Sequence, residues 1–214
     1  YSLTIIVFPE PGGSVVGTDV SCNGACDGMA TALVSGGTQP YTYLWANGCT
    51  TSSCTSLCAG TYNILVTDEN NCIMTSSVTI TEATALNNTV TGTTINCNGS
   101  CTGTVVSSPS GGTAPYTYLW DDGLLQTTQT ASNLCSAPGG VTYCVTITDL
   151  NGCSVVECVL INQPTQLSMI QNTISPSICS SNNGGACVNA LGGIAPYTIV
   201  WNDSANTIDS CISG

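Results

Sequence analysis

The amino-acid sequence predicts an all-β fold of tandem antiparallel β-sandwich repeats, each about 75–81 residues long and held together by disulfides. Short runs rich in Val, Ile, Thr and Tyr are separated by Gly, Asn and Pro turns, which is typical of strands. No segment has a convincing helical period of apolar residues. A tryptophan-containing segment recurs along the chain, as in repeat architectures. About seven strands per repeat fit an immunoglobulin-like or polycystic-kidney-disease-like sandwich.

The repeated element is the segment Gly-Gly-Thr-x-Pro-Tyr-Thr-Tyr-Leu-Trp. It ends at Trp45, at Trp120 and, in a variant form, at Trp201, so the tryptophans are 75 and 81 residues apart. A Cys-Asn-Gly turn precedes the first two copies. A strand that begins with Tyr and ends with Thr-Asp, followed by a cysteine, comes after them. The internal alignment therefore divides the chain into units of one kind.

This alignment predicts the domain boundaries. We expect full repeats over 12–83 and 84–164, and a third, truncated repeat over 165–214. Residues 1–11 resemble the closing strand of a preceding repeat. The chain is accordingly expected to be a window on a longer array.

The composition excludes several classes of function. The chain has 12 Asp and Glu residues and no Lys, Arg or His, which gives a formal net charge of −12. Without cations it cannot neutralise phosphates, so we expect no nucleic-acid partner and no nucleotide site. Without His or Lys it lacks ordinary catalytic triads, imidazole metal sites and Schiff-base chemistry, so we expect no enzyme. No apolar run could cross a membrane, and trypsin has no cleavage site.

Fifteen cysteines predict an oxidising, extracellular compartment. Zinc could use closely spaced thiolates, but no His accompanies them, so disulfides are favoured. Matching the cysteines between repeats predicts three kinds of bond. The first cysteine of a repeat bonds to its last cysteine, and the second cysteine bonds to the cysteine that precedes the Tyr strand. The remaining cysteines bond to near neighbours in the sequence. The expected bridges are Cys22–Cys72, Cys26–Cys58, Cys49–Cys54, Cys97–Cys153, Cys101–Cys135, Cys144–Cys158 and Cys187–Cys211, with Cys179 unpaired in this window.

Acidic clusters raise the question of calcium, which binds carboxylate and amide oxygens. The candidate ligands are Asp68, Glu69 and Asp149, although no EF-hand or nonapeptide motif surrounds them. A turn role for Asp68 and Asp149 is the favoured interpretation. Calcium is the one cofactor considered, and nothing singles out a pair of catalytic carboxylates.

The aromatic strand has two interpretations. Tyr41, Tyr43 and Trp45 point to one side of it, because side chains alternate along a strand. They could form the core of the sandwich, with the tryptophan on the inner face, as in immunoglobulin-like domains. They could instead form an exposed platform for sugar rings, and a carbohydrate-binding module would require that exposure. The core interpretation is favoured.

The composite pattern resembles the SprB repeat, a family of very large surface proteins of Bacteroidota that includes the gliding-motility adhesin. The matching residues are Cys22-Asn23-Gly24, Gly36 to Trp45, Ala59-Gly60-Thr61-Tyr62, Val66-Thr67-Asp68 and Cys72. The second repeat matches apart from an altered approach to its Tyr strand, over residues 138–143, and the third matches up to its truncation. The resemblance implies export, with the type IX system as the route, and display at the cell surface. It carries over no catalytic residue.

Candidate glycosylation sites accompany this surface location. Asn87, Asn98 and Asn202 begin Asn-x-Ser/Thr sequons, and Ser204 lies in an Asp-Ser-Ala sequence that resembles a Bacteroidota O-glycosylation signal. A sequon this short also matches by chance.

Together these features predict an extracellular structural and adhesive repeat array of a large secreted protein, which spans distance and mediates attachment. The expected partners are copies of itself or neighbouring repeats, with surface glycans as a further candidate and no direct insertion into a membrane. The alternative is a self-assembling extracellular filament or sheath subunit joined by strand complementation. A carbohydrate-binding module ranks third.

Overall fold

The computed structural model describes residues 8–175, 184–203 and 205–213, and its named elements are all strands. The strands are β1 (Pro11–Thr18), β2 (Gly28–Gly36), β3 (Thr42–Trp45), β4 (Ser53–Leu57), β5 (Gly60–Thr67), β6 (Ile73–Ile80), β7 (Asn87–Gly92), β8 (Gly103–Ser110), β9 (Thr117–Trp120), β10 (Thr130–Leu134), β11 (Val141–Thr148), β12 (Ser154–Ile161), β13 (Ser168–Ser175), β14 (Gly185–Leu191) and β15 (Cys211–Ser213). Within the described ranges no helix has the length and apolar character needed to span a bilayer.

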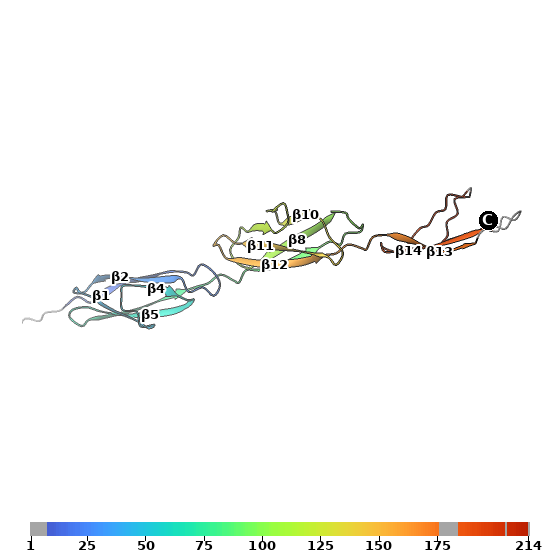
Figure 1. Ribbon diagram of the computed structural model, residues 1–214. Coiled ribbons are helices and arrows are strands. Elements are labelled where there is room, and N and C mark those ends of the chain that lie inside the picture. Colours follow the sequence, from blue (N-terminus) through green and yellow to red (C-terminus); the bar gives the residue numbers. More distant parts are fainter. Residues whose placement is uncertain (1–7, 176–183, 204, 214) are drawn as a thin grey trace, which may run out of the picture. The chain divides into compact units, whose positions relative to one another are not determined.

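The first repeat consists of two three-stranded sheets. One has the order β1-β2-β4 and the other β3-β5-β6, and their pairings are antiparallel. Figure 1 shows β1, β2 and β4 on one side of this repeat and β5 on the other. The two sheets approach closely where Gly17 faces β6, since a Cβ at that position would lie 2.8 Å from the side chains of Val78 and Ile80. The repeat is therefore a β-sandwich, as predicted, with six strands rather than about seven.

The second repeat has the same design, with sheets in the order β10-β8-β7 and β12-β11-β9. Its buried side chains occupy the same motif positions as those of the first repeat. The pairs are Val20 and Ile95, Ala30 and Val105, Ala32 and Ser107, Trp45 and Trp120, Cys54 and Ala131, Leu57 and Leu134, Ile64 and Val145, Val66 and Ile147, and Ile80 and Ile161. The same alternating pattern, apolar except at Ser107, thus specifies the core of both repeats.

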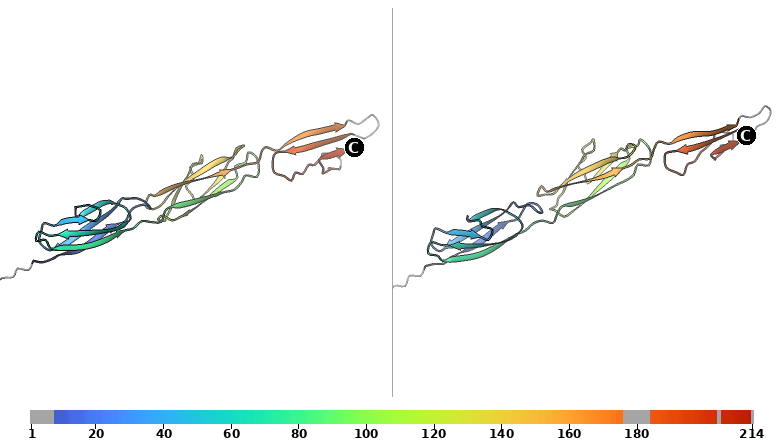
Figure 2. Two further views of the ribbon diagram at one scale, coloured as in Figure 1. Left: turned by 90° about the horizontal axis from the view of Figure 1, so that it is seen from below. Right: turned by 60° about the horizontal axis from the view of Figure 1, so that its bottom comes forward.

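The third repeat forms one sheet in the order β13-β14-β15 among the described residues. Figure 2 shows β13 and β14 side by side in both views. An isolated bridge pairs Val200 with Ile208, and the exposed fractions of these two side chains are 59% and 71%. This repeat accordingly leaves apolar side chains in contact with solvent.

The strand expected over residues 1–11 is only partly open to comparison. Residues 1–7 lie outside the described part of the chain, residues 8–10 are not in a strand, and Pro11 begins β1. β1 pairs with β2 over its whole length, from Pro11 opposite Gly36 to Thr18 opposite Met29. Pro11 therefore belongs to the first repeat.

Contacts between residues group the chain into two compact units that do not coincide with the repeats. The first comprises Tyr1–Asn88 together with Pro109–Thr117 and Ile147–Val155. The second comprises Thr89–Ser108, Tyr118–Thr146 and Val156–Gly214. Two loops of the second repeat are thus counted with the first repeat.

Candidate functional site: the braced turn and the disulfide junction

The aromatic strand lies in the core of the first two repeats. The exposed fractions of Trp45 and Trp120 are 1% and 0%, and Tyr41 and Tyr43 pack against the core of the first repeat. The indole Nε1 of Trp45 donates a hydrogen bond to the carbonyl of Thr51 at 2.9 Å. The sugar platform considered from the sequence requires exposed rings, and these tryptophans are buried.

A buried carboxylate braces one end of the first repeat. Asp68 follows β5, and its Oδ2 accepts a hydrogen bond from the backbone N–H of Thr38 at 2.9 Å. Its Oδ1 accepts bonds from the N–H groups of Asn70 and Cys72 at 3.0 and 2.8 Å. One carboxylate therefore joins the Gly-Gly-Thr loop to the turn that carries Cys72.

The double glycine makes room for this brace. Gly37 has a φ of 63°, which L side chains rarely adopt, and a Cβ there would lie 3.1 Å from Oδ2 of Asp68. The hydroxyl of Tyr41 then donates a hydrogen bond to the carbonyl of Gly36. The Gly-Gly-Thr-x-Pro-Tyr motif is thus a loop that presents an N–H group to a carboxylate.

The second repeat builds the same brace. Oδ2 of Asp149 accepts from the N–H of Thr113 at 2.9 Å, and Oδ1 accepts from Asn151 and Cys153, both at 2.9 Å. A Cβ on Gly112 would lie 2.8 Å from Oδ2. Sequence reasoning identified these motifs but not their contact, although both copies repeat the same Gly-Gly-Thr and Asp-x-x-x-Cys spacing.

These contacts also bear on the calcium candidates. Burial works against ionisation of Asp68, but hydrogen bonds from the backbone of Thr38, Cys72 and Asn70 outweigh it and lower the pKa of the carboxyl below its usual value. The N–H of Thr113 is the largest influence that lowers the pKa of Asp149. The oxygens face N–H donors, as the turn interpretation requires. Among the residues placed by the structure, no three His, Cys, Asp or Glu side chains gather as a metal site would require.

In the first two repeats, the Cys-Asn-Gly turn is hydrogen-bonded to the end of the same repeat. Nδ2 of Asn23 donates to the carbonyl of Ala83 at 3.0 Å, and the N–H of Gly24 donates to Oε2 of Glu82 at 2.6 Å. In the second repeat, Asn98 and Gly99 make the matching bonds to Pro164 and Gln163, at 3.0 and 2.9 Å. The residues around Cys22 and Cys97, the first cysteines of these two repeats, are therefore fixed.

Four disulfides coincide with the expected pairs. They are Cys26–Cys58, Cys101–Cys135, Cys144–Cys158 and Cys187–Cys211. In the third repeat, Cys187 of β14 lies directly opposite Cys211 of β15, which places the two side chains within bonding reach.

Two expected bridges are wrong in this structure. Cys22 does not bond to Cys72, nor Cys97 to Cys153; instead Cys22 bonds to Cys153, with a Cα–Cα distance of 5.7 Å. The physical reason is the placement of loops at the end of the second repeat, which lie in one compact unit with the first repeat. Sequence matching assumed that each repeat closes on itself, so it did not predict a bond between Cys22 and Cys153.

The Cys49–Cys54 bridge is also absent, and both residues are free thiols. Cys54 takes the place in the core that Ala131 takes in the second repeat, and its exposed fraction is 4%. Burial raises the pKa of Cys54, whereas hydrogen bonds from Cys54 and Thr51 overcome burial and lower the pKa of Cys49. Cys54 therefore serves as a buried packing residue, as Ala131 does in the second repeat. Cys179 lies outside the described residues.

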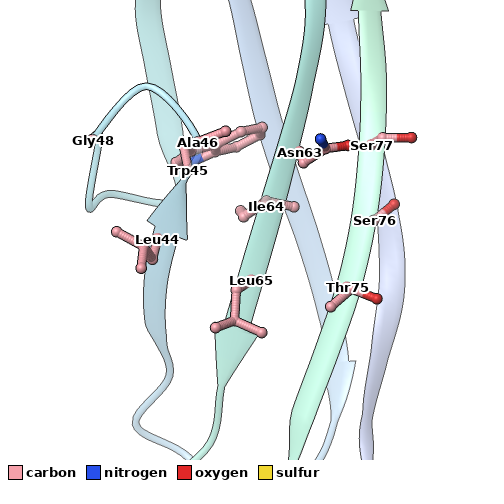
Figure 3. Close-up of a pocket in the computed structure, with 10 residues that line it drawn as sticks. All are labelled: Leu44, Trp45, Ala46, Gly48, Asn63, Ile64, Leu65, Thr75, Ser76 and Ser77. Atoms are coloured by element: carbon pink, nitrogen blue, oxygen red, sulfur yellow. The ribbon is translucent and has the colours of Figure 1, made fainter.

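The outer face of the sheet β3-β5-β6 carries an open groove of about 860 Å³. Figure 3 shows Gly48 on the loop after β3 and other lining residues on the three strands. Among the latter, Leu44, Leu65 and Thr75 lie opposite one another in the pairing. The groove offers no charged side chain. We assign it no ligand.

The candidate glycosylation sites lie at the surface where they are described. Asn87, Asn98 and Asn202 are exposed. The amide nitrogen of Asn87 already donates to the carbonyl of Ala85 at 3.0 Å. Ser204 lies outside the described residues.

Fold and junction together define a class of protein: tandem β-sandwich repeats with a repeated carboxylate brace and disulfides. The family model of the SprB repeat matches the chain three times, over residues 14–50, 89–125 and 171–206. These matches cover about half of the chain, and the chain belongs to the SprB-repeat family. A comparison with curated proteins gave no match.

Several solved structures of tandem domains are similar at low sequence identity. A complex of the Dpr2 and DIP-Theta immunoglobulin domains is 11% identical, with a TM-score of 0.34, over 97% of this chain and 83% of that chain. A tetra-tandem repeat from the extending region of a large adhesion protein is 14% identical, with a TM-score of 0.30, over 94% and 63%. A Dscam isoform structure is 8% identical, with a TM-score of 0.31, over 71% of this chain and 42% of that chain. The chain thus spans about two fifths of the length of that Dscam structure.

Proposed function

We propose that this chain is part of an extracellular, cell-surface array of β-sandwich repeats that spans distance and mediates attachment. The observation that supports this most directly is the repetition of one module, with the same core positions and the same aspartate brace in two successive repeats. Repeats that contact only their neighbours form extended structures that can be lengthened by adding units. Its role is mechanical and adhesive rather than enzymatic.

The chemistry of the chain suits an exposed location. The five disulfides among the described residues favour an oxidising compartment, and the absence of Lys and Arg leaves trypsin-like proteases without a site. We propose export to the surface of a Bacteroidota cell, with the type IX system as the route. Neighbouring repeats are the proposed partners, and surface glycans are a further candidate ligand.

Electron microscopy of the native surface material, in calcium and in chelator, tests this proposal. Beaded strands that extend from cells, and weaker attachment of cells that lack the protein, are the expected results. Regular polymers of identical subunits free of cells would instead support the second candidate below. If the beaded structures lose their extended form in chelator, calcium binding by Asp68, Glu69 and Asp149 would be supported.

A filament or sheath subunit is the second candidate, and the third repeat favours it. Trp201 is only partly buried, whereas Trp45 and Trp120 are buried, and Tyr197, Val200 and Ile208 are exposed. Strands from a second copy of this chain could cover these side chains by β-strand addition. Sedimentation of the purified chain over a range of concentrations tests this: assembly that buries Trp201 supports it, and a monomer at all concentrations contradicts it.

A further inference from the structure

Cys72 and Cys97 are free thiols, and they occupy the same motif positions as Cys153 and Cys22, which form a disulfide. Cys97 stands in the second repeat where Cys22 stands in the first, and Cys72 stands in the first repeat where Cys153 stands in the second. Cys22 and Cys153 are bonded, while Cys72 and Cys97 are free. Each free thiol therefore has an equivalent whose bonding partner is known.

The formed link has a defined surrounding. The side-chain amide of Asn151 donates to the carbonyl of Ser21 at 3.1 Å and to the hydroxyl of Thr113 at 3.2 Å. Asp149 holds the N–H groups of Thr113 and Cys153, each at 2.9 Å. The Gly-Gly-Thr loop of the second repeat thus lies beside the residue before Cys22, and the brace fixes Cys153 in the same place.

Cys97 also lies near the Gly-Gly loop of the repeat that follows it. A hollow of about 380 Å³ is lined by Asn96, Cys97 and Asn98 and by Leu167, Gly193 and Ile194 of the third repeat. Gly193 and Ile194 occupy the motif positions of Gly112 and Thr113. The N–H of Gly193 donates to the carbonyl of Thr165 at 2.8 Å, as that of Gly112 does to Thr84 at 2.8 Å.

We infer that Cys22–Cys153 is one rung of a repeating covalent ladder, in which the first cysteine of each SprB repeat bonds to the last cysteine of the repeat after it. Cys97 then bonds to a cysteine at the Cys153 position of a following repeat. Cys72 bonds to a cysteine at the Cys22 position of a preceding repeat. This inference rests on the proposed array, because the missing partners are cysteines of neighbouring repeats.

The bond forms by thiol–disulfide exchange with a disulfide oxidant, such as an oxidoreductase of the export compartment. The Cys97 thiolate attacks the oxidant, forms a mixed disulfide and releases one thiolate. The partner thiolate then attacks the sulfur of Cys97 and displaces the second thiolate. Two protein thiols are oxidised, the oxidant is reduced to two thiols, and the two protons pass to them.

The charge of the chain explains why covalent links between repeats would be useful. Interfaces between domains of one chain are commonly polar and permit motion. This chain has no Lys, Arg or His side chain, so no side-chain salt bridge can join one repeat to the next. Acidic repeats repel one another, and a covalent link holds them together without an ion pair.

Disulfide mapping of the oxidised full chain tests the rung itself. Free thiols are alkylated in the folded protein, which is then digested with pepsin at low pH, where thiol exchange is slow. A linked peptide containing Cys22 and Cys153, with Cys72 and Cys97 alkylated, is expected. Bonds from Cys22 to Cys72 and from Cys97 to Cys153 would overturn the inference.

The same mapping of the protein taken from the cell surface tests the ladder. Cys97 is expected to resist alkylation and to appear in a peptide linked to an Asp-x-x-x-Cys segment of another repeat. Alkylated Cys97 in that material would refute the ladder even if Cys22–Cys153 is present. In the Cys97→Ser variant, the cysteine at the Cys153 position of the following repeat should become a free thiol that reacts with the alkylating agent. The control variant Cys49→Ser should not expose that thiol. Attachment of the same cells, measured separately, tests the adhesive function, so either proposal can fail alone.

Discussion

At the scale of the residue, an aspartate after the Tyr strand organises one end of each complete repeat. Asp68 and Asp149 each accept three backbone hydrogen bonds, and in each case the neighbouring glycine leaves the space that the carboxylate occupies. Hydrogen bonds to an ionised acceptor are stronger than those between neutral groups. The brace should therefore depend on pH.

Asp68→Asn should lower the melting temperature at neutral pH, because the amide is a weaker acceptor than the carboxylate. The pKa of Asp68 is lowered in the folded state. The stabilisation is thus fully present above the unfolded-state value near 3.8 and is lost as the pH falls through the folded-state value. Thermal unfolding from pH 7 to pH 2 should show wild type and variant converging in acid. Glu69→Gln, an exposed neighbour, is the control, and a gap that persists at pH 2 would contradict the prediction.

Gly37→Ala should destabilise the first repeat by about 1 kcal/mol or more, since it combines a left-handed φ with close approach to Asp68. Gly24→Ala is a matched control: its φ is 75°, but nothing lies within 4 Å of the added Cβ. Chemical denaturation of both variants separates backbone strain from crowding. Equal losses would show that the brace tolerates a side chain at position 37.

At the scale of the element, the strand that ends in Trp45 shows how alternation divides one strand between core and solvent. Trp45 is 1% exposed and its neighbour Leu44 is 53% exposed. The same pair recurs as Trp120, which is buried, and Leu119, which is 49% exposed. Period-two patterning alone predicts these faces once one of them is known to be buried.

Trp45→Ala should cost about 3–5 kcal/mol, because it leaves a large cavity in a closely packed core. Leu44→Ala on the same strand should change stability by less than about 0.5 kcal/mol, since the side chain is exposed. Denaturant unfolding measured by tryptophan fluorescence for Leu44→Ala, and by circular dichroism for Trp45→Ala, checks both. Similar losses would mean that the outer groove of Figure 3 is itself a packed surface.

At the scale of the whole molecule, a formal net charge of −12 without one basic side chain leaves repulsion unopposed. Added sodium chloride should therefore raise the melting temperature, because the Debye length falls to about 10 Å at 0.1 M salt. Scans at several salt concentrations check this, with glycerol-free buffer of constant pH. A melting temperature that falls with salt would show that some attractive interaction outweighs the repulsion.

Reduction of the disulfides should lower the stability of the chain. By loop entropy the Cys26–Cys58 bond is worth about 3–4 kcal/mol and the Cys22–Cys153 bond about 5 kcal/mol. Cys22→Ser and Cys26→Ser should lower the melting temperature of the oxidised chain, and reductant should remove most of the difference from wild type. A Cys22→Ser variant as stable as wild type would argue against the Cys22–Cys153 bond.

Much of the protein followed from the sequence because its signals are local and repeated. Alternation, glycine turns and the recurring tryptophan segment predicted the β-sandwich repeats, which the structure confirms. The pairing of Cys26 with Cys58 could be anticipated, because both lie within one repeat and the motif recurs at Cys101 and Cys135.

Only the tertiary structure decided the partner of Cys22. Loop entropy differs by only about 1 kcal/mol between a bond to Cys72 and a bond to Cys153, so chain length does not select one. Selection depends on which sulfur the folded repeats bring within reach, since cysteines whose Cα atoms are more than about 7 Å apart cannot be bridged without backbone movement. Cys54 likewise packs in the core as a free thiol, although sequence spacing predicted a bond to the neighbouring Cys49. Contacts between residues distant in the sequence set these distances, and no local pattern encodes them.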